Sequence, residues 1–193
     1  MDKKFIFFYS QLYKKQQQHF KFKLNITIVS DTLINQVFKN KNSSIPIWFL
    51  RQAGRHIPEY FQIRENEKNF INFCLNEDLI IRSTTLPLKY YDLDAAIIFS
   101  DILMIPWAMD RNVKFTKNYG PSLKPMIPNE TKFLKNISLS SKLEPLKNSI
   151  SFLRDNLPKS LSLIGFAGAP WTLACYMIEG TGSKDFINTR KAL

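Results

Sequence analysis

Two arginines enclose a turn of small residues early in the sequence. Arg51 and Arg55 flank Gln52, Ala53 and Gly54, directly after an apolar run. The planar guanidinium fork of arginine matches a carboxylate through two parallel hydrogen bonds. Small residues let the backbone approach a ligand and present its N–H groups to an anion. The segment predicts a carboxylate-binding turn, and the alternative is a strand end followed by surface ion pairs.

A lone acid follows an apolar run in the middle of the chain. Asp101 comes shortly after residues 93–99, and more apolar residues follow it. A carboxylate in such a setting is costly unless something binds it. In parallel α/β folds, ligands bind at the C-terminal ends of the strands. The pattern therefore indicates a functional carboxylate, and an equal alternative is that Ser100 or Asp101 caps a helix.

A third segment runs from Gly165 to Gly180 and carries small residues before a helical pattern. Gly168 and the alanine after it keep the turn open, and Pro170 suits the first turn of a helix. Tyr176 lies on that helix and is able to reach a ligand from it. The alternative is a core tyrosine whose hydroxyl group bonds locally.

Apolar runs predict the strands that position these segments. Buried strands are expected at residues 46–50, 93–99 and 161–166, and a hairpin-like excursion at residues 112–124. Runs that are apolar throughout are typical of parallel strands covered on both faces.

Helical patterns lie between the predicted strands. They cover residues 32–38, 64–91 and 141–157. Asp31 is the expected N-cap of the first of these helices, Pro87 interrupts the second, and Ser183 opens a further helix. Strands that alternate with helices predict an α/β protein with a parallel sheet.

Composition narrows the classes of partner. The 193 residues carry a net charge of +11, but they hold no finger, basic zipper or RNA-binding aromatic motif, so we expect no nucleic-acid partner. No apolar stretch reaches the length of about 20 residues that spans a bilayer, so no membrane partner is expected. Cys74 and Cys175 form neither a metal-ligand spacing nor a disulfide framework, which favours a reducing cytoplasm.

Taken in order, the three segments resemble the landmarks of the uroporphyrinogen decarboxylase family. The resemblance extends from about residue 31 to the last residue. It departs from the family at Cys175, where serine or threonine is common, and at Met109-Asp110, where Leu-Gly is frequent and the local turn is expected to differ. The resemblance implies a (β/α)8 TIM barrel, with only its N-terminal part in residues 29–193.

Both ends of the chain carry expectations of their own. Residues 1–28 have no counterpart in a typical family member, which suggests a disordered leader or a start placed too far upstream. A helical pattern continues to the last residue without a stop signal, so we expect a truncated chain. A later serine and histidine that contact substrate in the family would lie beyond it.

The resemblance also implies an activity. Family members convert the four acetate side chains of uroporphyrinogen III to methyls, giving coproporphyrinogen III, without metal or organic cofactor. Asp101 and Arg51 would be the catalytic residues. The substrate-binding residues would be Arg51, Gln52, Ala53, Gly54, Arg55, Asp101 and Tyr176. A homodimer is expected of the full-length form.

Two other interpretations stay open at this point. One is a related barrel methyltransferase that binds zinc, whose ligands would lie in a later part of the chain. The other is a non-functional gene fragment, and even on the decarboxylase interpretation we expect the chain alone to be inactive.

Overall fold

A computed structural model describes residues 32–41, 44–50, 52–54, 56–116, 120–126, 139–165 and 167–192. These residues belong to one compact unit, Asp31–Leu193. The predicted leader, residues 1–28, lies outside the described residues.

Two parallel strands form the centre of this unit. Strand β1 (Ala95–Ile97) pairs with β4 (Ser162–Ile164), with Ala96 opposite Leu163. Parallel neighbours require a crossover connection, and here it holds several helices and a small hairpin. The prediction of strands within residues 93–99 and 161–166, parallel to each other, is confirmed. The described residues are thus of the mixed α/β class.

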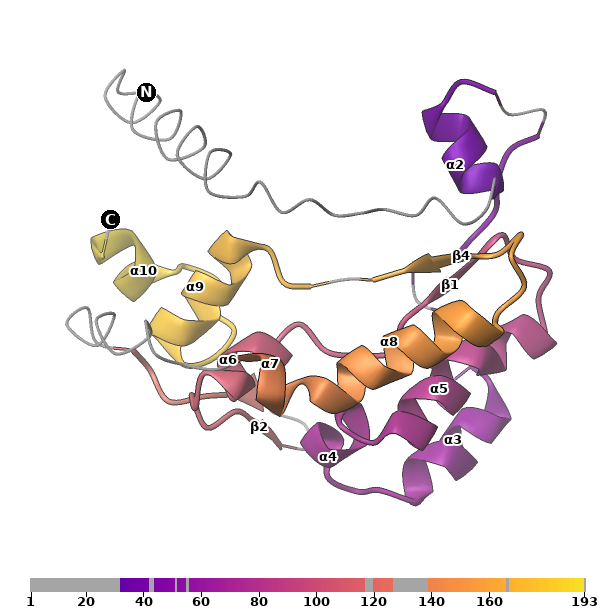
Figure 1. The fold of residues 1–193 in the computed structure, drawn as a ribbon. Coiled ribbons are helices and arrows are strands. Elements are labelled where there is room, and N and C mark those ends of the chain that lie inside the picture. The colour runs from indigo at the N-terminus through magenta and orange to yellow at the C-terminus, as the bar shows by residue number, and fades with distance from the viewer. Residues whose placement is uncertain are drawn as a thin grey trace. The chain divides into compact units, whose positions relative to one another are not determined.

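Two helices cover one face of this strand pair (Figure 1). Helix α5 (Glu77–Thr85) packs along α8 (Glu144–Asn156), and Ile80, Ile98 and Leu153 meet between helices and strands. Helix α8 follows the short α7 (Leu139–Lys142) and ends before Pro158, which confirms the helical prediction for residues 141–157.

The predicted helical region at residues 64–91 is divided into separate pieces. They are α3 (Pro58–Glu65), α4 (Phe70–Cys74), α5 and the 3-10 helix η1 (Leu86–Lys89). Asn69 and Asn76 start α4 and α5 because their side-chain oxygens accept N–H groups of the first helical turn. Pro87 lies in η1, so the predicted interruption is confirmed.

The prediction of a buried strand at residues 46–50 is wrong. Ile47 and Asp94 exchange two hydrogen bonds: the Ile47 N–H donates to the Asp94 carboxylate at 2.7 Å, and its carbonyl accepts the Asp94 N–H at 2.9 Å. No ladder continues from this contact within the described residues, and Leu50 is 79% exposed. Residues 46–50 are therefore apolar without being buried.

Helix α2 (Leu33–Phe38) confirms the predicted helix at residues 32–38, with a different cap. Thr32 is the N-cap, and its hydroxyl oxygen accepts the N–H of Asn35 at 3.3 Å. Asp31, the predicted cap, lies outside the described residues. The Thr32 hydroxyl also accepts a hydrogen bond from Ser162 at 2.7 Å, which links α2 to β4.

The hairpin-like excursion is confirmed as β2 (Lys114–Thr116) paired antiparallel with β3 (Gly120–Ser122). It follows the short helix α6 (Met104–Ala108). Between them Asp110 has φ +59°, a conformation that glycine adopts most easily. The departure from the resemblance at Met109-Asp110 thus places an aspartate in a conformation that favours glycine.

The third segment forms α9 (Pro170–Glu179), with Pro170 at its start as predicted. Gly180 ends the helix at φ +78°, where an added Cβ would lie 2.7 Å from Pro125 Cγ. The prediction that Ser183 opens the next helix is wrong, because α10 spans Ile187–Lys191. The Ser183 hydroxyl instead accepts the Phe186 N–H ahead of that helix. No helix among the described residues is long and apolar enough to cross a bilayer.

Candidate active site

Asp101 lies just beyond the C-terminal end of β1, in the turn that leads into α6. Its Oδ1 accepts the N–H of Leu103 at 2.8 Å, and its carbonyl accepts the N–H of Met104 at 3.2 Å. The N-cap position of α6 is Leu103, so Asp101 closes a local turn and is not itself the cap residue. The strand-end position that the sequence indicated is therefore the observed one, while the capping alternative is met only in part.

The carboxylate of Asp101 is poorly compensated. Burial raises the pKa of Asp101 above its usual range, and the hydrogen bond from the Leu103 N–H offsets only part of this effect. That N–H is the single hydrogen-bond donor that the described part of the chain supplies to the carboxylate. A half-desolvated carboxylate with spare acceptor capacity is suited to receiving donors from a ligand.

A cysteine that sequence reasoning did not assign to the site lies near this carboxylate. The pKa of the Cys74 thiol is raised to about 12, mainly by burial; the Asp101 charge adds to the rise, and the Arg64 charge opposes it. The thiol is therefore neutral and chemically inert near pH 7.

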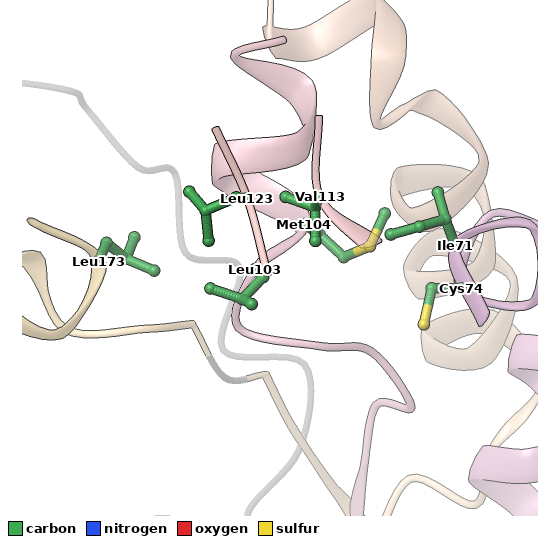
Figure 2. Packing of buried hydrophobic residues seen from close by; sticks show 7 residues of the cluster. All are labelled: Ile71, Cys74, Leu103, Met104, Val113, Leu123 and Leu173. Atoms are coloured by element: carbon green, nitrogen blue, oxygen red, sulfur yellow. The ribbon is translucent and has the colours of Figure 1, made fainter. Parts of the chain in front are cut away.

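An apolar cluster supports the turn that holds Asp101 (Figure 2). Leu103 is at its centre, and the cluster draws its side chains from α4, α6, the hairpin and α9. Its buried members are Ile71, Cys74, Leu103, Met104, Val113, Leu123 and Leu173. Phe99, at the end of β1, packs against this cluster and also against a second one formed by α3, α4 and α5. Asp101 thus sits on a turn anchored between two cores.

The second and third segments meet at Gly168. A Cβ added there would lie 2.4 Å from Leu173 Cδ2 and 3.3 Å from the Cβ of Ile102, the neighbour of Asp101. The Leu173 side chain would have to move to admit a Cβ here, so glycine suits this close approach. This contact was not predicted, although the small residues before Pro170 were its signal. At Gly165, in contrast, an added Cβ meets no atom within 4 Å.

Tyr176 is half-buried on α9 and packs against the apolar cluster around Leu103. Its backbone carbonyl accepts the Gly180 N–H at 2.8 Å and so helps to end the helix. The ring therefore has the packing role of the core-tyrosine alternative. The structure brings Tyr176 and the Asp101 turn to one cluster, and a substrate contact by its hydroxyl stays a prediction.

The first segment is described only in part, because Arg51 and Arg55 lie outside the described residues. Gln52 is 4% exposed, and Ala53 and Gly54 are half-buried. A Cβ added at Gly54 would meet only the ring of His56, at an ordinary distance of 3.5 Å. The backbone near Gly54 therefore has room, and nothing in the described residues presses on it.

The side chain of Gln52 has a role that the sequence did not reveal. Its Nε2 donates to the carbonyl of Ala95 at 2.7 Å, and its Oε1 accepts the N–H of Ile97 at 3.1 Å. The side chain thus binds the strand that leads to Asp101. The prediction for Gln52 concerned a backbone contact with substrate, which stays a prediction.

No group of three or more histidine, cysteine or acidic residues placed to hold a metal ion occurs in the part of the chain that the structure describes. Both cysteines are free and buried. The site consists of a carboxylate at a strand end, a glycine-mediated contact to α9 and an amide that binds β1.

Comparison with known proteins places this arrangement in a family. The family model described as "Uroporphyrinogen decarboxylase (URO-D)" matches residues 30–193. The chain therefore belongs to the uroporphyrinogen decarboxylase family.

Curated relatives with the name uroporphyrinogen decarboxylase agree with this assignment. The chain is 46% identical to one from Rickettsia felis over 160 residues, which cover 82% of this chain and 46% of the relative. It is also 46% identical to one from Rickettsia africae over 153 residues, which cover 79% of this chain and 44% of that relative. The chain thus spans under half the length of the curated relatives it matches.

Proposed function

We propose that this chain contributes the Asp101 site to an enzyme that decarboxylates the acetate side chains of uroporphyrinogen III, giving coproporphyrinogen III. One observation carries the proposal. In a chain of this family, a carboxylate with a raised pKa, and with a single N–H donor among the described residues, lies beyond the end of a parallel strand. The C-terminal ends of such strands are where α/β enzymes bind their substrates.

In this proposal Asp101 stabilises the positive charge that develops on the substrate. Protonation of a pyrrole α-carbon makes the ring cationic, and Asp101 accepts hydrogen bonds from the pyrrole N–H groups and stabilises that cation. The acetate C–C bond then breaks, its electron pair moves into the ring and CO2 leaves. The methylene carbon takes up a proton to become a methyl, and loss of the first proton restores the pyrrole. A preorganised charge in a water-poor site is often the largest catalytic contribution.

The first and third segments hold the substrate in this scheme. Arg51 and Arg55 bind its carboxylates through bidentate pairs, and Arg51 also assists proton transfer or positioning. Backbone N–H groups from Gln52 to Gly54 add contacts, and Tyr176 lies near the reacting acetate. These roles rest on the family motif and on arginine chemistry.

The wider setting is proposed on the same basis. The enzyme is a (β/α)8 barrel that uses no metal or organic cofactor, since the substrate ring itself accepts the electron pair. It acts in the cytoplasm, where free buried thiols such as Cys74 and Cys175 are stable. It forms a homodimer in its full-length form.

Activity of a hybrid protein tests the proposal. The hybrid joins this chain to the part of the Rickettsia felis relative that the match does not cover. Uroporphyrinogen III is supplied under reducing conditions, and the products are separated as porphyrins after oxidation. We expect sequential loss of four carboxyl groups by the hybrid, and no measurable turnover by residues 1–193 alone. A hybrid that unfolds cooperatively yet leaves the substrate intact would contradict the proposal.

A further inference from the structure

The edge of β1 that faces away from β4 has no complete strand beside it among the described residues. The register with β4 uses the N–H of Ile98 and the carbonyl of Asp94, which bond to Ile164 and Ser162. The carbonyl of Ala95 and the N–H of Ile97 therefore point to the opposite edge. Buried backbone groups of this kind need partners.

A side-chain amide supplies both partners. Gln52 carries one carbonyl and one NH₂ group, the same pair of functions as a peptide unit. Its Nε2 binds Ala95 and its Oε1 binds Ile97, at 2.7 and 3.1 Å. The amide thus stands in for a residue of a neighbouring strand. With 4% exposure, its side chain has little surface left for a substrate.

The position of Gln52 in the sequence connects two of the segments that the proposed function uses. The residue lies between Arg51 and Arg55, and the strand it binds leads directly to Asp101. The two hydrogen bonds join Gln52, and with it the described residues 52–54, to the strand that precedes Asp101. Two bonds to one planar amide fix both distance and orientation, which a single bond does not.

We infer that Gln52 is a positioning residue that sets residues 52–54, the described part of the turn between Arg51 and Arg55 (the arginine turn), at a fixed distance from Asp101 through its two side-chain hydrogen bonds to β1. The structural part of the inference stands on the two hydrogen bonds, whereas its effect on catalysis rests on the proposed function. Substrate carboxylates held by the turn and a pyrrole held by Asp101 belong to one rigid molecule. An error of about 1 Å between the two groups therefore suffices to lower the rate up to about 100-fold.

The test compares substitutions of two side chains that bind backbone groups on the same edge of β1 and the residues after it. Gln52→Met keeps the length of the side chain and removes both hydrogen bonds. Thr84→Val is the matched control, because the Thr84 hydroxyl accepts the N–H of Phe99 at 2.9 Å but has no link to the arginine turn. Both variants leave buried backbone groups without a side-chain partner, so both are expected to lower the melting temperature.

Kinetics in the hybrid separate positioning from stability. For Gln52→Met we expect kcat/KM to fall about 10- to 100-fold, with KM raised, at temperatures where the protein is folded. Thr84→Val should keep KM within about twofold. In Gln52→Glu the protonated carboxyl restores both hydrogen bonds, so its activity relative to the parent protein should recover as pH falls. A normal KM and kcat for folded Gln52→Met would overturn the inference.

Hydrogen exchange in residues 1–193 gives a readout that needs no activity. Gln52→Met should speed amide exchange in peptides covering residues 52–57, whereas Thr84→Val should leave those peptides unchanged. An inactive parent hybrid would defeat the proposed function, and the exchange data would then decide the inference alone. Unchanged exchange at residues 52–57 in Gln52→Met would show that the amide does not hold the turn.

Discussion

Asp101 and Glu179 are carboxylates in two landmark segments of one chain, and their surroundings differ in a way that separates their roles. Asp101 has one hydrogen-bond donor, a backbone N–H, among the residues that the structure describes, and burial raises its pKa. Glu179 ends α9 and accepts three hydrogen bonds from the start of α10, two from Thr189 and one from Asn188. The N–H of Thr189 is the main cause that lowers the pKa of Glu179.

The difference identifies which acid is available to a ligand. Three donors satisfy Glu179, so it serves as a cap for α10 and has little capacity left. The described residues leave most of the acceptor capacity of Asp101 unused, and its partial burial makes any added donor more effective. A carboxylate that the protein leaves under-compensated is a better candidate for chemistry than one that it satisfies.

The largest expected effect comes from removing the charge of Asp101. Asp101→Asn in the hybrid keeps the acceptor for the Leu103 N–H, so the local turn should persist. Because the amide cannot stabilise a cationic pyrrole, turnover should fall by a factor on the order of 10²–10³. Glu179→Gln is the matched control and should keep turnover within a few fold. Near-normal turnover in Asp101→Asn would reduce Asp101 to a turn-forming residue.

Crowding at Gly168 should produce the next largest effect. Gly168→Ala places a Cβ against Leu173 and Ile102, and we expect it to cost about 1–3 kcal/mol of unfolding free energy, as overpacking commonly does. Since Ile102 adjoins Asp101, turnover in the hybrid should fall as well. Gly165→Ala meets open space and serves as the control in urea denaturation. Equal stabilities of the two variants would mean that α9 does not press on the Asp101 turn.

The pH dependence of stability should have opposite signs at the two acids. The folded pKa of Asp101 lies above its ordinary value of 3.8, so its charge destabilises the fold as pH rises through the folded pKa. The folded pKa of Glu179 lies below 4.5, so its contribution is complete above that value and is lost as pH falls through the folded pKa. At pH 7 Asp101→Asn should therefore be stabilising and Glu179→Gln destabilising.

Urea denaturation of residues 1–193 and of each variant between pH 3 and pH 7 measures the differences in unfolding free energy between variant and parent. Each difference should shrink toward zero as pH falls, because protonation makes the parent side chain as neutral as its replacement. If both substitutions changed the unfolding free energy in the same direction at pH 7, the proposed electrostatic difference between Asp101 and Glu179 would be contradicted.

The smallest effect is expected from residues 1–28. They precede the family match, which begins at residue 30, and both acids lie far beyond them in the sequence. Deleting them from the hybrid should change neither turnover nor melting temperature measurably. A melting temperature lower by several degrees would show that this segment packs on the rest of the protein.

Elements defined by local chemistry were predictable from the sequence. The apolar runs located β1 and β4, and Pro170 marked the start of α9. Residues 46–50 misled the prediction because an apolar run reports burial only when other elements cover it. The two asparagine caps that divide residues 64–91 were overlooked, although asparagine is a preferred cap.

Long-range contacts were not predictable in the same way. The amide of Gln52 reaches Ala95 and Ile97 across more than 40 residues, and no local pattern encodes that pairing. The Cys74 thiol lies near Asp101 for the same reason, since the fold and not the spacing brings them together. The strand-end position of Asp101 was predictable because it follows directly from the apolar run before it.

The buried thiol of Cys74 offers a way to measure local opening of the fold by chemical labelling. With a pKa of about 12 and no exposed surface, it can be alkylated only when the packing around α4 opens. The labelling rate in a native solution therefore measures how often this packing opens, in the way that amide exchange measures the opening of a helix. In a Cys175→Ser variant, Cys74 is the remaining thiol of the chain, and on the proposed function a bound tetrapyrrole should slow its labelling.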